Sequence, residues 1–145
     1  MTAPAPPSPI RRVGIVAKRQ LHEAASLLDD IADWLVLRGI TPVFETGTAR
    51  LGQGGRAWPS ASREDLPRAV DLMLVLGGDG TLLGMADRIA MTAPRVPILG
   101  VNFGSLGFLT EITLPELYAS LESVVAGEAG YEPRAVLTAT VTPAG

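Results

Sequence analysis

The chain has 145 residues, the length of one ordinary domain with room for a hydrophobic core. Its net charge of −3 offers no field for nucleic acid, and the zero cysteines exclude disulfides and zinc–thiolate sites. The apolar runs are far shorter than a membrane span. We therefore expect a cytoplasmic protein with no nucleic acid and no membrane among its partners.

The first part of the chain predicts an extension followed by alternating strands and helices. Residues 1–10 are rich in Ala and Pro, lack the features of a secretory signal, and predict a disordered extension. Residues 12–17 and 41–45 predict strands, and an amphipathic pattern from Ala24 to Leu35 predicts a helix that ends near Gly39. Residues 46–63 predict a loop that moves over the site.

The alternation continues to the end of the domain. Residues 71–76 predict a strand, residues 81–91 a helix and residues 97–101 a further strand. Thr113 and Glu116 predict a capping box that opens the last helix, and Gly127 ends it. This order predicts an α/β fold with a Rossmann-like, doubly wound parallel sheet over residues 11–130.

The glycine-rich turn Gly77–Thr81 follows the predicted strand 71–76, at the sheet edge where open α/β proteins bind ligands. Its glycines permit close approach to backbone amides, and the start of the next helix suits phosphate oxygens. The turn is neither a Walker A loop nor a G-x-G-x-x-G motif. Asp79 is unexpected in an anion cradle. It is either a local turn residue, or a carboxylate that accepts a hydroxyl proton or holds a metal on phosphates.

A second glycine-rich segment, GVNFGSLGFLTE, spans residues 100–111 after the next predicted strand. Its glycines predict tight turns or close backbone approach. Phe108 is either a core side chain or an apolar wall for an aromatic ring of a ligand. Asn102 ends a buried strand and needs partners, either in the Asp79 turn or on a ribose hydroxyl.

Together, GGDGT and NxGxLGF at this spacing resemble the bacterial NAD kinases from about Arg11 to Val141. GGDGT alone also occurs in lipid kinases, whereas NxGxLGF is far more selective. The resemblance implies transfer of a phosphoryl group from ATP or polyphosphate, with Mg²⁺, to the adenosine ribose 2′-hydroxyl of NAD, which gives NADP. It also implies a homo-oligomer at full length.

The resemblance also implies roles for individual residues. Asp79 resembles the general base of the family. The dinucleotide site is implied at Asp79, Gly80, Leu83, Leu106, Gly107 and Phe108. Lys18 and Arg19 follow the first strand and either meet phosphate oxygens or are solvated side chains, a choice that the sequence leaves open.

The chain differs from the family pattern near its end. NAD kinases continue into a β-rich domain that carries an Asn-Glu or Asn-Asp pair, and this chain contains no such dipeptide. We therefore expect residues 131–145 to begin a truncated second domain, with an alternating strand at 135–141 and little activity in the chain alone. The alternatives are a lipid kinase of the diacylglycerol type that shares the GGDGT turn, and a non-catalytic nucleotide-binding fragment.

Overall fold

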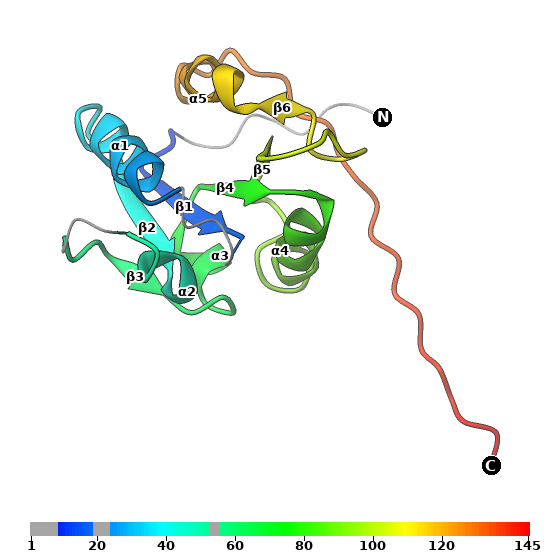
Figure 1. The fold of residues 1–145 in the computed structure, drawn as a ribbon. Helices are drawn as coiled ribbons and strands as arrows, with labels where there is room; N and C mark the ends of the chain where they lie inside the picture. The colour runs from blue at the N-terminus through cyan, green and yellow to red at the C-terminus, as the bar shows by residue number, and fades with distance from the viewer. Residues whose placement is uncertain (1–8, 19–23, 53–55) are drawn as a thin grey trace.

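The computed structural model describes residues 9–18, 24–52 and 56–145. Within them, six strands form one parallel sheet in the order β3-β2-β1-β4-β5-β6. The strands are β1 (Arg12–Ala17), β2 (Thr41–Glu45), β3 (Ser60–Ala61), β4 (Leu72–Gly77), β5 (Ile98–Asn102) and β6 (Ile112–Thr113). The helices are α1 (Ala25–Val36), α2 (Thr46–Ala49), α3 (Leu66–Ala69), α4 (Asp79–Thr92) and α5 (Leu117–Val125), with a 3₁₀ turn at Leu114–Glu116. Figure 1 shows the arrangement.

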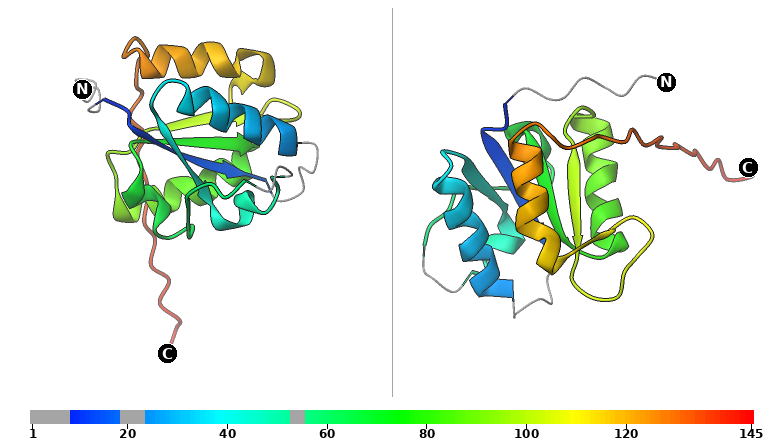
Figure 2. Two further views of the ribbon diagram at one scale, coloured as in Figure 1. Left: turned by 90° about the vertical axis from the view of Figure 1, so that its left-hand side faces the viewer. Right: turned by 90° about the horizontal axis from the view of Figure 1, so that it is seen from above.

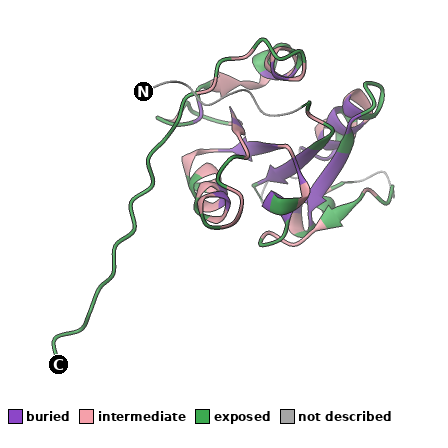
Figure 3. Ribbon diagram, turned by 180° about the vertical axis from the view of Figure 1, so that it is seen from behind, coloured by how far each residue is buried: buried purple, intermediate pink, exposed green. Residues whose placement is uncertain are grey.

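Helices cover both faces of the sheet, which confirms the doubly wound α/β prediction (Figure 2). On one face, α1 and α5 pack on alternate side chains of β1 and β4, including Ile15 and Leu74. On the other face, α3 and α4 pack on the intervening positions, including Val16 and Val75. The central strands are buried along nearly their whole length (Figure 3). Their residues are apolar at nearly every position, as strands covered on both faces require.

The strand order positions the ligand edge. The chain moves outward from β1 to β2 and β3 and then crosses back to β4, so the order reverses between β1 and β4. Ala17 pairs with Leu76, and Gly77 pairs with Asn102. The ends of β1, β4 and β5 therefore lie side by side. In doubly wound sheets this reversal point at the carboxyl edge is where ligands bind.

The predicted long elements are confirmed, with boundaries that differ by one or two residues. The predicted loop at 46–63 is wrong in part, because it contains α2 and β3. Helix α2 forms because the Glu45 carboxylate accepts a hydrogen bond from Thr48 N at 2.9 Å and so caps its first turn. Strand β3 forms by pairing with Phe44 and Glu45.

The end of the chain departs from the expected strand. Residues 128–145 carry no regular secondary structure, and residues 132–145 are exposed (Figure 3). A strand at 135–141 does not form because a strand requires a neighbour for its hydrogen bonds, and this segment extends away from the sheet (Figure 1). The expected extension at 1–10 falls mostly outside the described residues.

Candidate active site

Asp79 is the first residue of α4 and follows the end of β4 by two residues. Backbone hydrogen bonds join the neighbouring strand ends around it: Lys18 N donates to Leu76 O, and Phe103 N donates to Gly77 O, each at 3.0 Å. Asp79 therefore lies at the carboxyl edge beside the reversal point of the sheet. This is the position that the sequence predicted for it.

The carboxylate of Asp79 is held by the loop that joins β5 to β6. Its Oδ2 accepts a hydrogen bond from Phe108 N at 2.8 Å. Its Oδ1 accepts three, from Leu109 N, Thr110 N and Thr110 Oγ1, each at 3.1 Å. The two glycine-rich segments of the sequence are thus joined through one side chain.

These hydrogen bonds change the acidity of Asp79. The pKa of Asp79 lies below its ordinary value of 3.8, chiefly because of the bond from Phe108 N, with the other three bonds adding to the effect against a smaller burial penalty. Hydrogen bonds to the ionised form favour that form. Asp79 is therefore ionised at neutral pH and can accept a hydrogen bond. Because its pKa is lowered, it is a weaker base than an ordinary aspartate.

Gly107 lies directly against this carboxylate. A Cβ added to Gly107 would overlap the Asp79 carboxyl group and lie 2.6 Å from Oδ2. Any larger residue would therefore displace the carboxylate or the loop. Gly104, in the same loop, has open space around its Cβ position. The glycine requirement within this loop is thus specific to the position that faces Asp79.

Asn102 organises the base of the loop. It is buried at the end of β5, and its Oδ1 accepts a bond from Gly104 N at 2.7 Å. Its Nδ2 donates to Ser105 O at 2.8 Å and to Thr110 Oγ1 at 2.9 Å. Of the two roles left open for Asn102, the structure supports bracing of the Asp79 loop.

The sequence did not identify Thr110 as a site residue. Thr110 is fully buried, and its hydroxyl donates a hydrogen bond to Asp79.

The other predicted site residues surround Asp79 in the two segments. Gly80 is exposed in the first turn of α4, and Leu83 and Leu106 are each more than half exposed. Phe108 is 93% exposed, so a role in the core is wrong for this side chain. Lys18 lies beside the turn, with its Cβ 3.4 Å from a Cβ position on Gly77. Arg19 lies outside the described residues.

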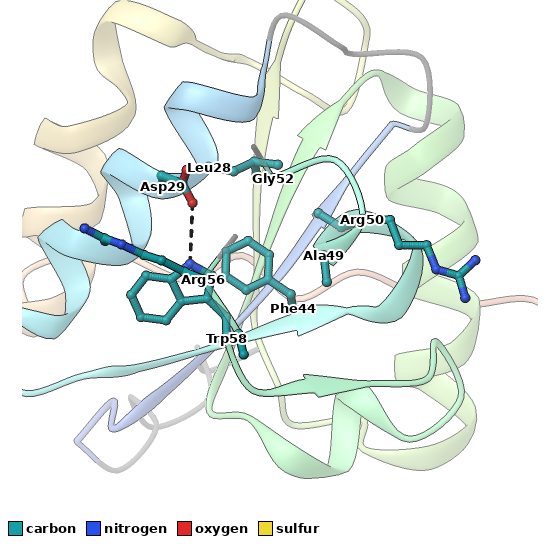
Figure 4. A pocket seen from close by; sticks show the side chains of 10 residues that line it. Leu28, Asp29, Phe44, Ala49, Arg50, Gly52, Arg56 and Trp58 are labelled. Atoms are coloured by element: carbon teal, nitrogen blue, oxygen red, sulfur yellow. Dashed lines mark hydrogen bonds between the residues drawn. The ribbon is translucent and has the colours of Figure 1, made fainter. Parts of the chain in front are cut away.

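A separate hollow of about 240 Å³ lies between α1 and β2 (Figure 4). Phe44 and Trp58 form one wall, with ring centroids 6.4 Å apart, and Asp29 approaches Trp58 Nε1 at 3.5 Å. Asp79 is not among the described residues that line it. The hollow therefore lies apart from the carboxylate site.

The described residues contain no group of three or more His, Cys, Asp or Glu side chains that could hold a metal ion. No helix within 9–18, 24–52 or 56–145 has the length and apolarity needed to cross a membrane.

The chain thus forms a Rossmann-like α/β domain that carries an anchored carboxylate in a glycine-rich turn at the carboxyl edge of its sheet. The sequence profile of the ATP-NAD kinase N-terminal domain matches residues 13–129. The chain belongs to the ATP-NAD kinase family. The recognition made from the two glycine-rich motifs is confirmed.

Curated relatives agree with this assignment, and a solved structure shares the fold. The chain is 46% identical over 132 residues to NAD kinase from Syntrophotalea carbinolica, covering 91% of this chain and 45% of that protein. It is 42% identical over 132 residues to NAD kinase from Geobacter sulfurreducens, covering 91% and 45%. The chain thus spans less than half the length of these relatives. The crystal structure of yeast NADH kinase complexed with NADH shares the fold, with a TM-score of 0.68 and 20% identity over 85% of this chain and 40% of that one.

Proposed function

We propose that this chain is the amino-terminal half of an NAD kinase. The enzyme transfers a phosphoryl group from ATP, or from polyphosphate, to the 2′-hydroxyl of the adenosine ribose of NAD and produces NADP. Family membership and the naming of the curated relatives as NAD kinases support this reaction. The observation that carries it is the Asp79 carboxylate, held at the ligand edge by donors of the second glycine-rich segment.

Asp79 serves in this proposal as the acceptor of the hydroxyl proton. The O–H bond of the ribose breaks, its proton passes to the carboxylate, and the oxygen forms a bond to the transferred phosphorus. The bond from that phosphorus to the bridging oxygen breaks, and ADP leaves with the electron pair. Since the pKa of Asp79 is lowered, the proton moves late, and the carboxylate acts mainly by orienting the hydroxyl in line with the phosphorus.

The lone pairs that remain free on Asp79 determine which of its two oxygens accepts the proton of the ribose hydroxyl. A carboxylate oxygen has two lone-pair sites. Within the described residues, Oδ1 accepts three bonds and Oδ2 accepts one. We therefore assign the acceptor role to Oδ2. Mg²⁺ would enter with the nucleotide substrate and would offset the negative charge of its phosphates in the transition state.

The remaining site residues provide contacts with NAD. Gly80, Gly107 and the exposed side chains of Leu83, Leu106 and Phe108 lie in the two segments joined at Asp79. Apolar and aromatic side chains next to a few polar groups are typical of dinucleotide sites. We further propose a cytoplasmic homo-oligomer in which residues 131–145 begin a β-rich domain that closes the site, in keeping with relatives more than twice as long.

The test is NADP formation by the full-length gene product and by residues 1–145 alone, each with NAD, ATP and Mg²⁺. We expect activity from the full-length protein and little or none from residues 1–145. A parallel assay offers diacylglycerol in place of NAD. Phosphorylation of the lipid, with no NADP formed by the full-length protein, would refute the proposed function.

A further inference from the structure

Thr110 is the one residue in the described chain that binds Asp79 with both its backbone and its side chain. Its N–H and its Oγ1 each lie 3.1 Å from Asp79 Oδ1. The residue is fully buried within the loop, so water does not compete for its hydroxyl. A buried hydroxyl aimed at a carboxylate fixes both the position and the charge state of that carboxylate.

Asn102 determines the direction of the hydrogen bond from Thr110. Its Nδ2 donates to Thr110 Oγ1 at 2.9 Å and so occupies a lone pair of the hydroxyl oxygen. A hydroxyl has one proton, and the Asp79 carboxylate is its acceptor at 3.1 Å. The bonds therefore run in one direction, from Asn102 to Thr110 and from Thr110 to Asp79. The second Nδ2 bond, to Ser105 O at 2.8 Å, fixes the amide so that it cannot reverse this order.

We propose that Thr110, oriented by Asn102, is a positioning residue whose hydroxyl holds Asp79 Oδ1 against the loop and so leaves Oδ2 to receive the hydroxyl of the substrate. This inference rests on the proposed function for its catalytic consequence. The positioning itself is a property of the chain and is measurable without turnover. The inference adds Thr110 and Asn102 to the residues on which the reaction depends, although neither touches the reacting atoms.

The test compares variants of the full-length gene product. Thr110→Val removes the hydroxyl and keeps the shape and the backbone N–H, and Thr110→Ser restores a hydroxyl. Thr110→Ala replaces the valine variant if that protein does not fold. The matched control is Thr113→Val, because the Thr113 hydroxyl lies in the same region and donates to Glu116 Oε2 at 2.8 Å instead of to Asp79.

Two measurements are made on each variant. The first is the pH dependence of kcat together with the KM for NAD. We expect Thr110→Val to lower kcat by about 10-fold or more, as loss of a hydrogen bond to a charged group does, with KM changed less than about 3-fold. The acid limb of kcat should move to higher pH, since the ionised carboxylate has lost a donor. Thr110→Ser should return both values toward wild type, and Thr113→Val should leave both unchanged.

The second measurement is the titration of the Asp79 carboxyl carbon by ¹³C NMR, which needs no activity. A rise in the pKa of Asp79 in Thr110→Val, absent in Thr113→Val, supports the positioning role even if the protein does not phosphorylate NAD. An unchanged titration in Thr110→Val overturns the positioning role, whatever the activity. An equal shift of the acid limb in the Thr113 control would also overturn it, because the effect would then not be specific to Asp79.

Discussion

The backbone of Gly107 lies against the carboxylate of Asp79 so closely that a Cβ at Gly107 would overlap the carboxyl group. Phe108 N, the next amide in the chain, donates to Asp79 Oδ2 at 2.8 Å. The loop between β5 and β6 therefore folds around a carboxylate that the turn after β4 provides. The two glycine-rich segments therefore contact each other through this one carboxylate.

We predict that Gly107→Ala displaces the Asp79 carboxylate. Because the carboxylate is fixed by four hydrogen bonds, it cannot yield without losing some of them. The turnover of the full-length protein should fall by about 10²-fold, the effect of a misplacement near 1 Å. Gly104→Ala is the control, since its Cβ would meet open space. Equal turnover in the two variants would mean that the Asp79 loop tolerates the displacement.

Stability at acid pH should depend on Asp79. Its folded pKa is lower than its unfolded value, so its contribution to stability is fully present above the ordinary value of 3.8 and is lost as the pH falls through the folded pKa. Urea unfolding between pH 2 and 7 should show wild type more stable than Asp79→Asn near neutral pH. The difference should shrink as the pH falls below about 4. A difference that stays constant over this range would contradict the hydrogen-bonded carboxylate.

Phe108→Ala should weaken NAD binding without affecting the fold. The side chain is 93% exposed, so its removal leaves the core intact and the unfolding midpoint unchanged. Stacking of an aromatic side chain on a base contributes about 1–3 kcal/mol, and we expect the KM for NAD to rise about 5-fold to 100-fold. Leu37→Ala, which removes an exposed apolar side chain after α1, is the control and should leave the KM unchanged. An unchanged KM in Phe108→Ala would remove Phe108 from the site.

The exposed apolar side chains of residues 136–141 should promote self-association of the 145-residue chain. Val136, Leu137 and Val141 are exposed, and Leu137 is 95% accessible to solvent. Exposed apolar side chains within one short segment favour contact with other chains. Light scattering should show less association after removal of residues 134–145, or in the double variant Leu137→Asp/Val141→Asp. A monodisperse monomer of the unaltered chain at high concentration would show that this segment does not drive association.

The long elements of the fold were predictable because their side chains either repeat with the helical period or form an unbroken apolar run. The continuous apolar run 72–76 predicts a strand buried on both faces, and that strand is β4. The elements of two to four residues were not predictable, since so short a segment shows no period. Strand β6, for example, is two residues long and exists by pairing with Val101 and Asn102. Its formation is a consequence of tertiary structure.

The position of the candidate site was predictable from the sequence, but the hydrogen bonds within it were not. The turn after a buried strand places Asp79 at the carboxyl edge of the sheet, which the structure bears out. The donors that hold Asp79 are mainly backbone N–H groups of residues 108–110, and backbone donors leave no mark on the amino-acid sequence. Thr110 carried a weak signal at most, because a threonine in a glycine-rich loop is ordinarily a turn residue.

The most direct test of the central claim is the rate of NADP formation by the full-length gene product with Asp79 and with Asp79→Asn. An asparagine at this position keeps an oxygen for the donors on Leu109 and Thr110 and loses the bond from Phe108 N. The loop should therefore persist, with NAD binding changed only a few fold, while turnover falls by about 10²–10⁴ for loss of the proton acceptor. Collapsed NAD binding with normal residual turnover would contradict the account, because Asp79 would then anchor substrate or structure and take no part in the reaction.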